Sequence, residues 1–140
     1  MKLVTTNDQI TAIADSLLDF PQVDMPVKHS FAPGVYMREM SAPAGTLVIG
    51  AEHRTEHFNI LSKGKLRVKV DGNLMEIKAP YSFVSKAGSM KVAIVLEDMV
   101  FVTIHPTTET DVDKLEEMLF VKSEKRKAWE LGQKMLKEAA

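Results

Sequence analysis

Two histidines four residues apart, His53 and His57, stand in the stretch GAEHRTEHFNILSKG. The chain contains no cysteine, so a metal ion could be held only by imidazole, carboxylate or water. Neutral imidazole suits Fe(II), Mn(II), Ni(II) and Zn(II), and a third ligand is needed to hold any of these ions firmly. We take His105, at the end of FVTIHP, as that third ligand, with Glu52 and Glu56 as further candidates.

The same histidines also have a purely structural interpretation. Histidines at the mouth of a sheet often hydrogen-bond to a backbone carbonyl or a carboxylate without doing chemistry, and Glu52, Arg54 and Glu56 could build such a polar rim. His105 could likewise cap the turn before Pro106. The metal-binding and structural interpretations both stay open at this point.

Lys91 and Arg38 offer a different chemistry. If FNILS is a strand, alternation places His57 and Asn59 on one face. If Lys91 and Arg38 point towards that face, the pocket favours a carboxylate, phosphate or nucleotide over a bare cation. The alternative is that both cations lie on exposed strand faces.

Short β-type runs separated by turn signals fill residues 35–104 and must position these side chains. This pattern is typical of an antiparallel sandwich or small barrel, and Asp71-Gly72 is its clearest hairpin turn. We also expect turns at Lys63-Gly64 and Glu97-Asp98, so that the predicted strands are VYMREM, TLVIG, FNILS, KLRVKV, LMEIKA, PYSFVS, MKVAIVL and MVFVTI.

Helices are predicted at both ends of the chain. Thr6 and Gln9 form a capping-box pattern before helical periodicity over residues 7–19. Beyond the strands, Thr110 and Ser123 can each cap a helix, and the second of these helices is rich in Lys and Glu.

The bulk composition limits the classes of partner. The 140 residues suit one domain, divided into a helix and connector start (1–22), a barrel (23–106) and a helical arm (107–140). Lys and Arg number 18 and Asp and Glu 19, giving a net charge of −1, so neither nucleic acid nor an anionic membrane is an expected partner. We expect a soluble, cytoplasmic protein.

The stretch PAGTLVIGAEHRTEHFNILSKGKLRV resembles the first motif of the cupin superfamily, a group of metal-binding β-barrels. Aligned on Gly64, the family's glutamate falls on His57, its second histidine on His53 and its first on Ala51. The second family motif matches KAGSMK and places Lys91 where the last histidine ligand would be. The resemblance therefore implies a barrel pocket that keeps two of the four usual ligand positions.

A longer resemblance, over nearly the whole chain, is to short cupin-like proteins encoded by tailed bacteriophages and prophages. Their strand reads Gly-His-x-His-x-Thr-x-His-Phe-Asn, which this chain matches from His53 to Asn59 and departs from at Ala51. The resemblance implies a mainly β fold: a single cupin-type antiparallel double-sheet barrel with an N-terminal helix and a C-terminal helical arm. It also implies a homo-oligomer, such as a dimer, for which Trp129 in the arm is a candidate contact.

Three classes of function remain open. The first is a pocket protein that binds a divalent metal through His53 and His57, with any enzymatic activity resting on fold analogy alone. The second is a metal-free binder of an anionic or nucleotide-like small molecule, using Asn59, Lys91 and Arg38. The third is a structural or accessory phage protein, for which the virion replaces the host cytoplasm as the expected location.

Overall fold

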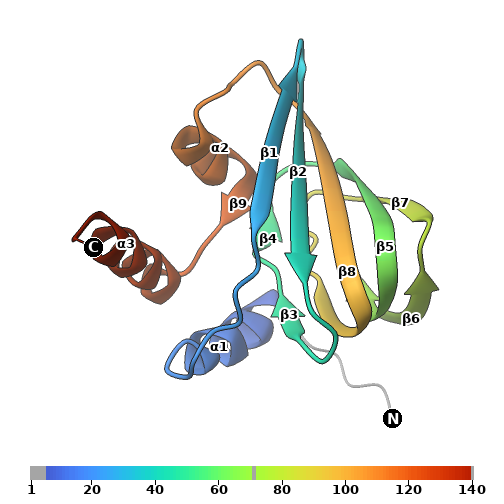
Figure 1. Cartoon of the computed structure of the whole chain (residues 1–140), viewed down its shortest axis with the longest axis horizontal. Coiled ribbons are helices and arrows are strands. Elements are labelled where there is room, and N and C mark those ends of the chain that lie inside the picture. Colours follow the sequence, from blue (N-terminus) through green and yellow to red (C-terminus); the bar gives the residue numbers. More distant parts are fainter. Residues whose placement is uncertain (1–5, 71, 140) are drawn as a thin grey trace.

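The computed structural model describes residues 6–70 and 72–139, which form a barrel of strands with helices on one side (Figure 1). The helices are α1 (Asn7–Leu17), α2 (Val112–Leu119) and α3 (Glu124–Ala139). The strands are β1 (Val27–Ala32), β2 (Val35–Ala42), β3 (Leu47–Ile49), β4 (Glu52–His53), β5 (His57–Val70), β6 (Asn73–Lys78), β7 (Tyr81–Ser85), β8 (Val92–Pro106) and β9 (Phe120–Val121). The predicted mainly β fold with helices at both ends is confirmed.

The long strands β5 and β8 pair with each other and are shared between two layers of the barrel. The first part of β5, residues 57–61, pairs with β7, and residues 65–70 pair with β6. In β8, residues 99–106 pair with β2, which carries β1 at its outer edge, and residues 92–94 pair with β3. Because β5 and β8 each contribute to both layers, they join the two layers into one sheet.

The expected turns at Lys63-Gly64 and Glu97-Asp98 are wrong, because both dipeptides lie inside long strands. Register shifts between Leu61 and Leu66 mark irregular pairing of β5 with β8 at this level. Gly64 has φ +94°, and a Cβ atom there would lie 2.7 Å from the carbonyl oxygen of Glu97. Glycine therefore lets the two strands bend together in close contact where its sequence signal suggested an end.

The hairpin between β5 and β6 forms where it was predicted. Val70 pairs with Asn73, and Gly72 has φ +82°, which suits a tight hairpin turn. Asp71, the other residue of the predicted turn, lies outside the described residues.

Helix α1 begins with the predicted capping box and is attached to the barrel by a polar side chain. The backbone N–H of Gln9 donates to Thr6 Oγ1 at 3.2 Å, and the N–H of Thr6 donates to Gln9 Oε1 at 2.9 Å. Asn7 Nδ2 donates to Glu52 Oε1 at 2.6 Å and to the carbonyl of Gly88 at 2.9 Å. The helix thereby contacts the segment that carries the histidine pair.

Helix α2 is capped by Asp111, which corrects the expected cap at Thr110. The Asp111 carboxylate accepts from the N–H of Lys114 at 3.1 Å, because Asp111 is the extended residue directly before the helix. Ser123 precedes α3 as predicted, and its hydroxyl accepts from the N–H of Arg126 at 3.1 Å. None of the described helices is long and apolar enough to cross a lipid bilayer.

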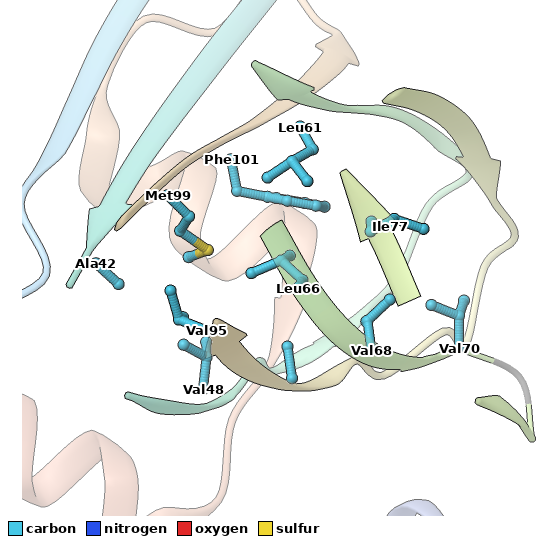
Figure 2. Close-up of a cluster of buried hydrophobic side chains, with 11 residues drawn as sticks. Ala42, Val48, Leu61, Leu66, Val68, Val70, Ile77, Val95, Met99 and Phe101 are labelled. Carbon is cyan, nitrogen blue, oxygen red and sulfur yellow. The ribbon is translucent and has the colours of Figure 1, made fainter. Parts of the chain in front are cut away.

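The hydrophobic core lies between the two layers. Apolar side chains from β2, β3, β5, β6 and β8 turn towards a common interior (Figure 2). Leu61, Leu66, Val68 and Val95 are at most 2 % exposed, so this part of the barrel is shielded from solvent.

Candidate functional site

Three of the four histidines meet at one end of the barrel. His57 begins β5, His105 lies near the end of β8, and His53 comes from the short strand β4. The backbone N–H of His53 donates to the carbonyl of Ser89 at 2.9 Å, and the N–H of Gly88 donates to the carbonyl of His53 at 2.8 Å. These bonds fix β4 against the turn before Lys91.

The three imidazole rings are stacked. The His53 and His57 ring centroids lie 4.0 Å apart at 21° between their planes, and those of His57 and His105 lie 5.1 Å apart at 28°. Tyr36 continues the stack, with its ring centroid 5.8 Å from that of His105. Imidazole lone pairs lie in the plane of the ring, so rings stacked in this way direct their nitrogens side by side instead of towards one point.

His57 hydrogen-bonds to Lys91. The Nδ1 atom of His57 lies 3.0 Å from the carbonyl of Thr55, which can only accept, so Nδ1 carries the hydrogen. The Nε2 atom therefore has a lone pair, and it accepts from Lys91 Nζ at 3.1 Å. The lone pair with which His57 could bind a metal is thus directed at a lysine ammonium.

Burial keeps the three histidines uncharged at neutral pH. Desolvation lowers the pKa of His53 to about 2 and the pKa values of His57 and His105 to about 4. The positive charge of Lys91 is a further cause of all three lowered values. The positive charge at this end of the barrel therefore comes from Lys91 and its arginine neighbours.

The residues do not fit a metal ion in this arrangement. Among residues 6–70 and 72–139, no group of three or more histidine, aspartate or glutamate side chains is placed to hold one. Ala51 is buried at the position of the family's first histidine, and Glu52 accepts from Asn7. Glu56 is exposed. A metal bound by His57 would have to displace the Lys91 ammonium.

A cavity of about 140 Å³ lies beside the histidine cluster, inside the barrel. Its polar lining comes from Arg38, His53, Lys91, Thr103 and Arg126. Within the described part of the chain, no aspartate or glutamate lines it. The remaining lining is largely apolar, so the cavity combines positive charge with a hydrophobic wall.

An ion-pair network holds the cations of the cavity in place. Arg38 pairs with Glu116 of α2, which also accepts from Lys122 Nζ at 2.7 Å. Lys122 reaches Glu130 of α3 at 2.8 Å, and Glu130 accepts from Arg126 Nε at 3.1 Å. The network joins a barrel strand to both C-terminal helices, and it begins and ends at a cavity-lining arginine.

The network also fixes the charge state of Glu116. Burial alone would raise the pKa of this carboxyl group, but the charges of Arg38 and Lys122 hold it below its ordinary value. The Arg38 guanidinium lies over the Phe120 ring, 5.1 Å from its centroid. Arg38 is therefore held on two sides in a largely buried position.

The C-terminal helices form the approach to the cavity. A groove between α2 and α3 shares Arg38, Phe120 and Arg126 with the cavity lining. No residue of α3 from Glu124 to Ala139 is buried. Polar contacts attach the helix, including Ser123 Oγ to Asp15 Oδ1 at 2.6 Å, so α3 covers this approach without joining the core.

The predicted site residues fall into two groups. Lys91, Arg38 and His53 line the cavity, whereas His57 and His105 are buried behind it. Of the predicted ligand-binding residues, Asn59 is fully buried and donates to Ser85 Oγ at 2.9 Å and to the carbonyl of Phe83 at 3.3 Å. Its side chain joins β5 to β7 and does not line the cavity.

Sequence reasoning did not identify Arg126 and Phe120 as site residues. Arg126 belongs to a helix whose composition indicated a solvated outer face. Phe120 lies in β9, a two-residue strand that pairs with β4 and was not expected. Both reach the cavity only through the tertiary placement of the C-terminal arm.

Comparison with known proteins supports the fold. No family model matches the chain, and no curated protein matches it. A cupin superfamily protein from Desulfitobacterium hafniense matches with a TM-score of 0.51 and 11 % identity, over 66 % of this chain and 85 % of that one. KdgF from Halomonas sp. matches with a TM-score of 0.52 and 17 % identity, over 64 % and 86 % of the two chains.

A third solved structure, a conserved protein of unknown function from Streptococcus pyogenes, has a TM-score of 0.50 and 12 % identity, covering 64 % of this chain and 80 % of its own. At these identities the likeness concerns the fold alone. The chain therefore has a cupin-like fold, as the resemblance implied.

The buried histidines predict a steep dependence of stability on pH. Their folded-state pKa values lie below the ordinary value of 6.5, so between pH 6.5 and about 4 the unfolded chain binds protons that the folded chain does not. The contribution of these histidines to the free energy of unfolding is therefore fully present above pH 6.5 and is lost as the pH falls. Each histidine contributes a slope of roughly 1.4 kcal/mol per pH unit.

Chemical denaturation from pH 4 to 7 measures this slope in the wild type and in His105→Gln. In His105→Gln the slope of unfolding free energy against pH should fall by roughly 1.4 kcal/mol per pH unit, whatever the absolute stability of the variant. His29→Gln is the matched control, because His29 is less buried and should change the slope less. An unchanged slope in His105→Gln would show that His105 is not buried uncharged.

Proposed function

We propose that this protein binds a small organic anion in its barrel without a metal ion. The observation that carries the proposal is the hydrogen bond between Lys91 Nζ and His57 Nε2, at 3.1 Å. It places a fixed positive charge at the end of the barrel where the family resemblance implies a metal. An ammonium group has no lone pair for a metal but attracts the oxygen atoms of a carboxylate or phosphate.

The surroundings of Lys91 support an anionic ligand. Arg38 and Arg126 also line the cavity, and the ion-pair network that holds them has three cations, Arg38, Lys122 and Arg126, against the two carboxylates Glu116 and Glu130. The nearby histidines are neutral, so they add no charge but offer polar atoms. An anion that leaves water for an apolar cavity needs this compensation, because burying a charge without a partner is strongly unfavourable.

A divalent metal remains the second candidate, for one specific reason. The Nδ1 atoms of His53 and His105 are buried and have no hydrogen-bond partner within the described residues. If a metal displaced Lys91, the ligands would be His53, His57 and His105, and Fe, Mn, Ni and Zn are the ions that suit them. If this second candidate is right, loss of the Lys91 ammonium should favour binding of the ligand, whereas for an anion it should weaken binding.

The resemblance to phage proteins bears on the origin, location and oligomeric state of the protein. We infer from it that the protein is phage- or prophage-encoded, acts in the host cytoplasm and forms a homodimer. A structural role in the virion is the alternative setting. Light scattering of the purified protein measures the oligomeric state, and a monomer at micromolar concentration would contradict the dimer.

Binding measurements on Lys91→Met test the proposed function. Isothermal titration with acetate, hexanoate, succinate and inorganic phosphate should identify at least one anion that binds the wild type with 1:1 stoichiometry. Loss of a charge-assisted hydrogen bond, worth about 1.5–3 kcal/mol, should weaken that binding at least tenfold in Lys91→Met. Lys86→Met is the matched control, because Lys86 is an exposed lysine of the same turn and its loss should leave the affinity unchanged.

Metal analysis of untagged protein separates the two candidates. We expect less than about a tenth of an equivalent of Fe, Mn, Ni or Zn in the wild type after growth in supplemented medium. About one equivalent of metal that is lost in His57→Ala, together with no binding of the four anions, would overturn the proposal in favour of the metal.

A further inference from the structure

We propose that the bound anion is amphipathic: a single acidic head group with an apolar hydrocarbon tail, as in a medium-chain aliphatic carboxylate. This inference rests on the proposed function and names the class of ligand. It is carried by the way polar and apolar side chains divide the interior into two zones.

The division follows from the register of three adjacent strands. On β2, β8 and β5, the inward residues Arg38, Thr103 and Asn59 face one another across the backbone pairing. The corresponding residues one step further into the barrel are Met40, Phe101 and Leu61. All three strands therefore change from polar to apolar at the same level.

The cations lie at the polar end. Arg38 belongs to the polar level and lies over the ring of Phe120, and both residues also line the groove between α2 and α3. Lys91 lies at the same end, against His57. An acidic head group bound at this end would lie near Lys91 and Arg38, where the cavity meets the groove between α2 and α3.

The deeper zone of the cavity is apolar. Its lining includes Met40, Val48, Leu66, Val68, Met99 and Phe101. Leu66, Met99 and Phe101 come from different parts of the barrel and turn towards the same interior (Figure 2). In the described lining this zone offers no charged side chain, so a second polar group on the ligand would be buried without a partner.

Two methionines make this wall adaptable. Met40 and Met99 are unbranched and can change rotamer to fit chains of different length. Methionine commonly fills irregular space in protein cores. The position of Met40 and Met99 on the wall of a cavity that begins at two cations gives them a second role, which is contact with a flexible tail.

A chain-length series tests the inference. Straight-chain carboxylates from butanoate to dodecanoate should bind the wild type roughly fourfold more tightly for each added methylene until the apolar zone is full. Affinity should then level off or fall. Primary alcohols of equal length should bind at least tenfold more weakly than the acids, and this difference should disappear in Lys91→Met.

Two variants should move the optimum length in opposite directions. Ala93→Leu adds volume to the cavity wall and should favour shorter chains, whereas Met40→Ala removes volume and should favour longer ones. Leu74→Ala is the control, because Leu74 is 70 % exposed outside the barrel. If either variant fails to fold, the wild-type series and the other variant still decide the question.

The outcomes separate this inference from the proposed function. Equal affinity for acetate, succinate and hexanoate would overturn the amphipathic ligand but keep an anion site, and the apolar zone would then be ordinary core. Failure of carboxylates and phosphate alike to bind would overturn both.

Discussion

The close pairing of β5 with β8 is the constraint on which the rest of the structure depends. Both strands bend at the level of Gly64, where a side chain would meet the carbonyl of Glu97. The bend lets each strand serve both layers of the barrel. It also carries the inward side chains of both strands from a polar end, with His57 and His105, to an apolar one.

The chemistry at the polar end depends on desolvation. Burial removes the charge from His53, His57 and His105, while the Arg38 guanidinium forms an ion pair with Glu116. Lys91 is directed at a neutral imidazole, which can accept its hydrogen but cannot neutralise it. The result is a barrel with a cupin-like fold in which a lysine and an arginine lie beside neutral imidazoles.

Much of this arrangement could be predicted from the sequence, because it depends on alternation. The placement of His57 and Asn59 on one face is correct, and the alternation of Tyr36, Arg38 and Met40 could have placed Arg38 inside as well. The alternation of side chains between the two faces of a strand is kept in the folded protein, because one face of each strand must be buried.

The rest depends on contacts between distant segments. The dipeptide Lys63-Gly64 has the residue types of a turn. Gly64 is instead a close-contact position, because the backbone carbonyls of Glu97 and Asp98 lie opposite it. Arg126 has no local signal, since its place in the cavity lining depends on the tertiary position of the start of α3 and on its ion pair with Glu130. The bond between Lys91 and His57 joins residues 34 positions apart. The cupin resemblance places both residues at ligand positions of one pocket, but the hydrogen bond itself depends on the tertiary fold.

The most direct test of the lysine–histidine contact is ¹⁵N NMR of histidine-labelled protein at pH 7, with the His57 signals assigned by substitution. The structure predicts a neutral His57 with its hydrogen on Nδ1, and an Nε2 resonance that shifts in Lys91→Met but not in Lys86→Met. A His57 protonated on Nε2, or an Nε2 resonance unaffected by the loss of Lys91, would contradict a lysine at the position where the fold family holds a metal.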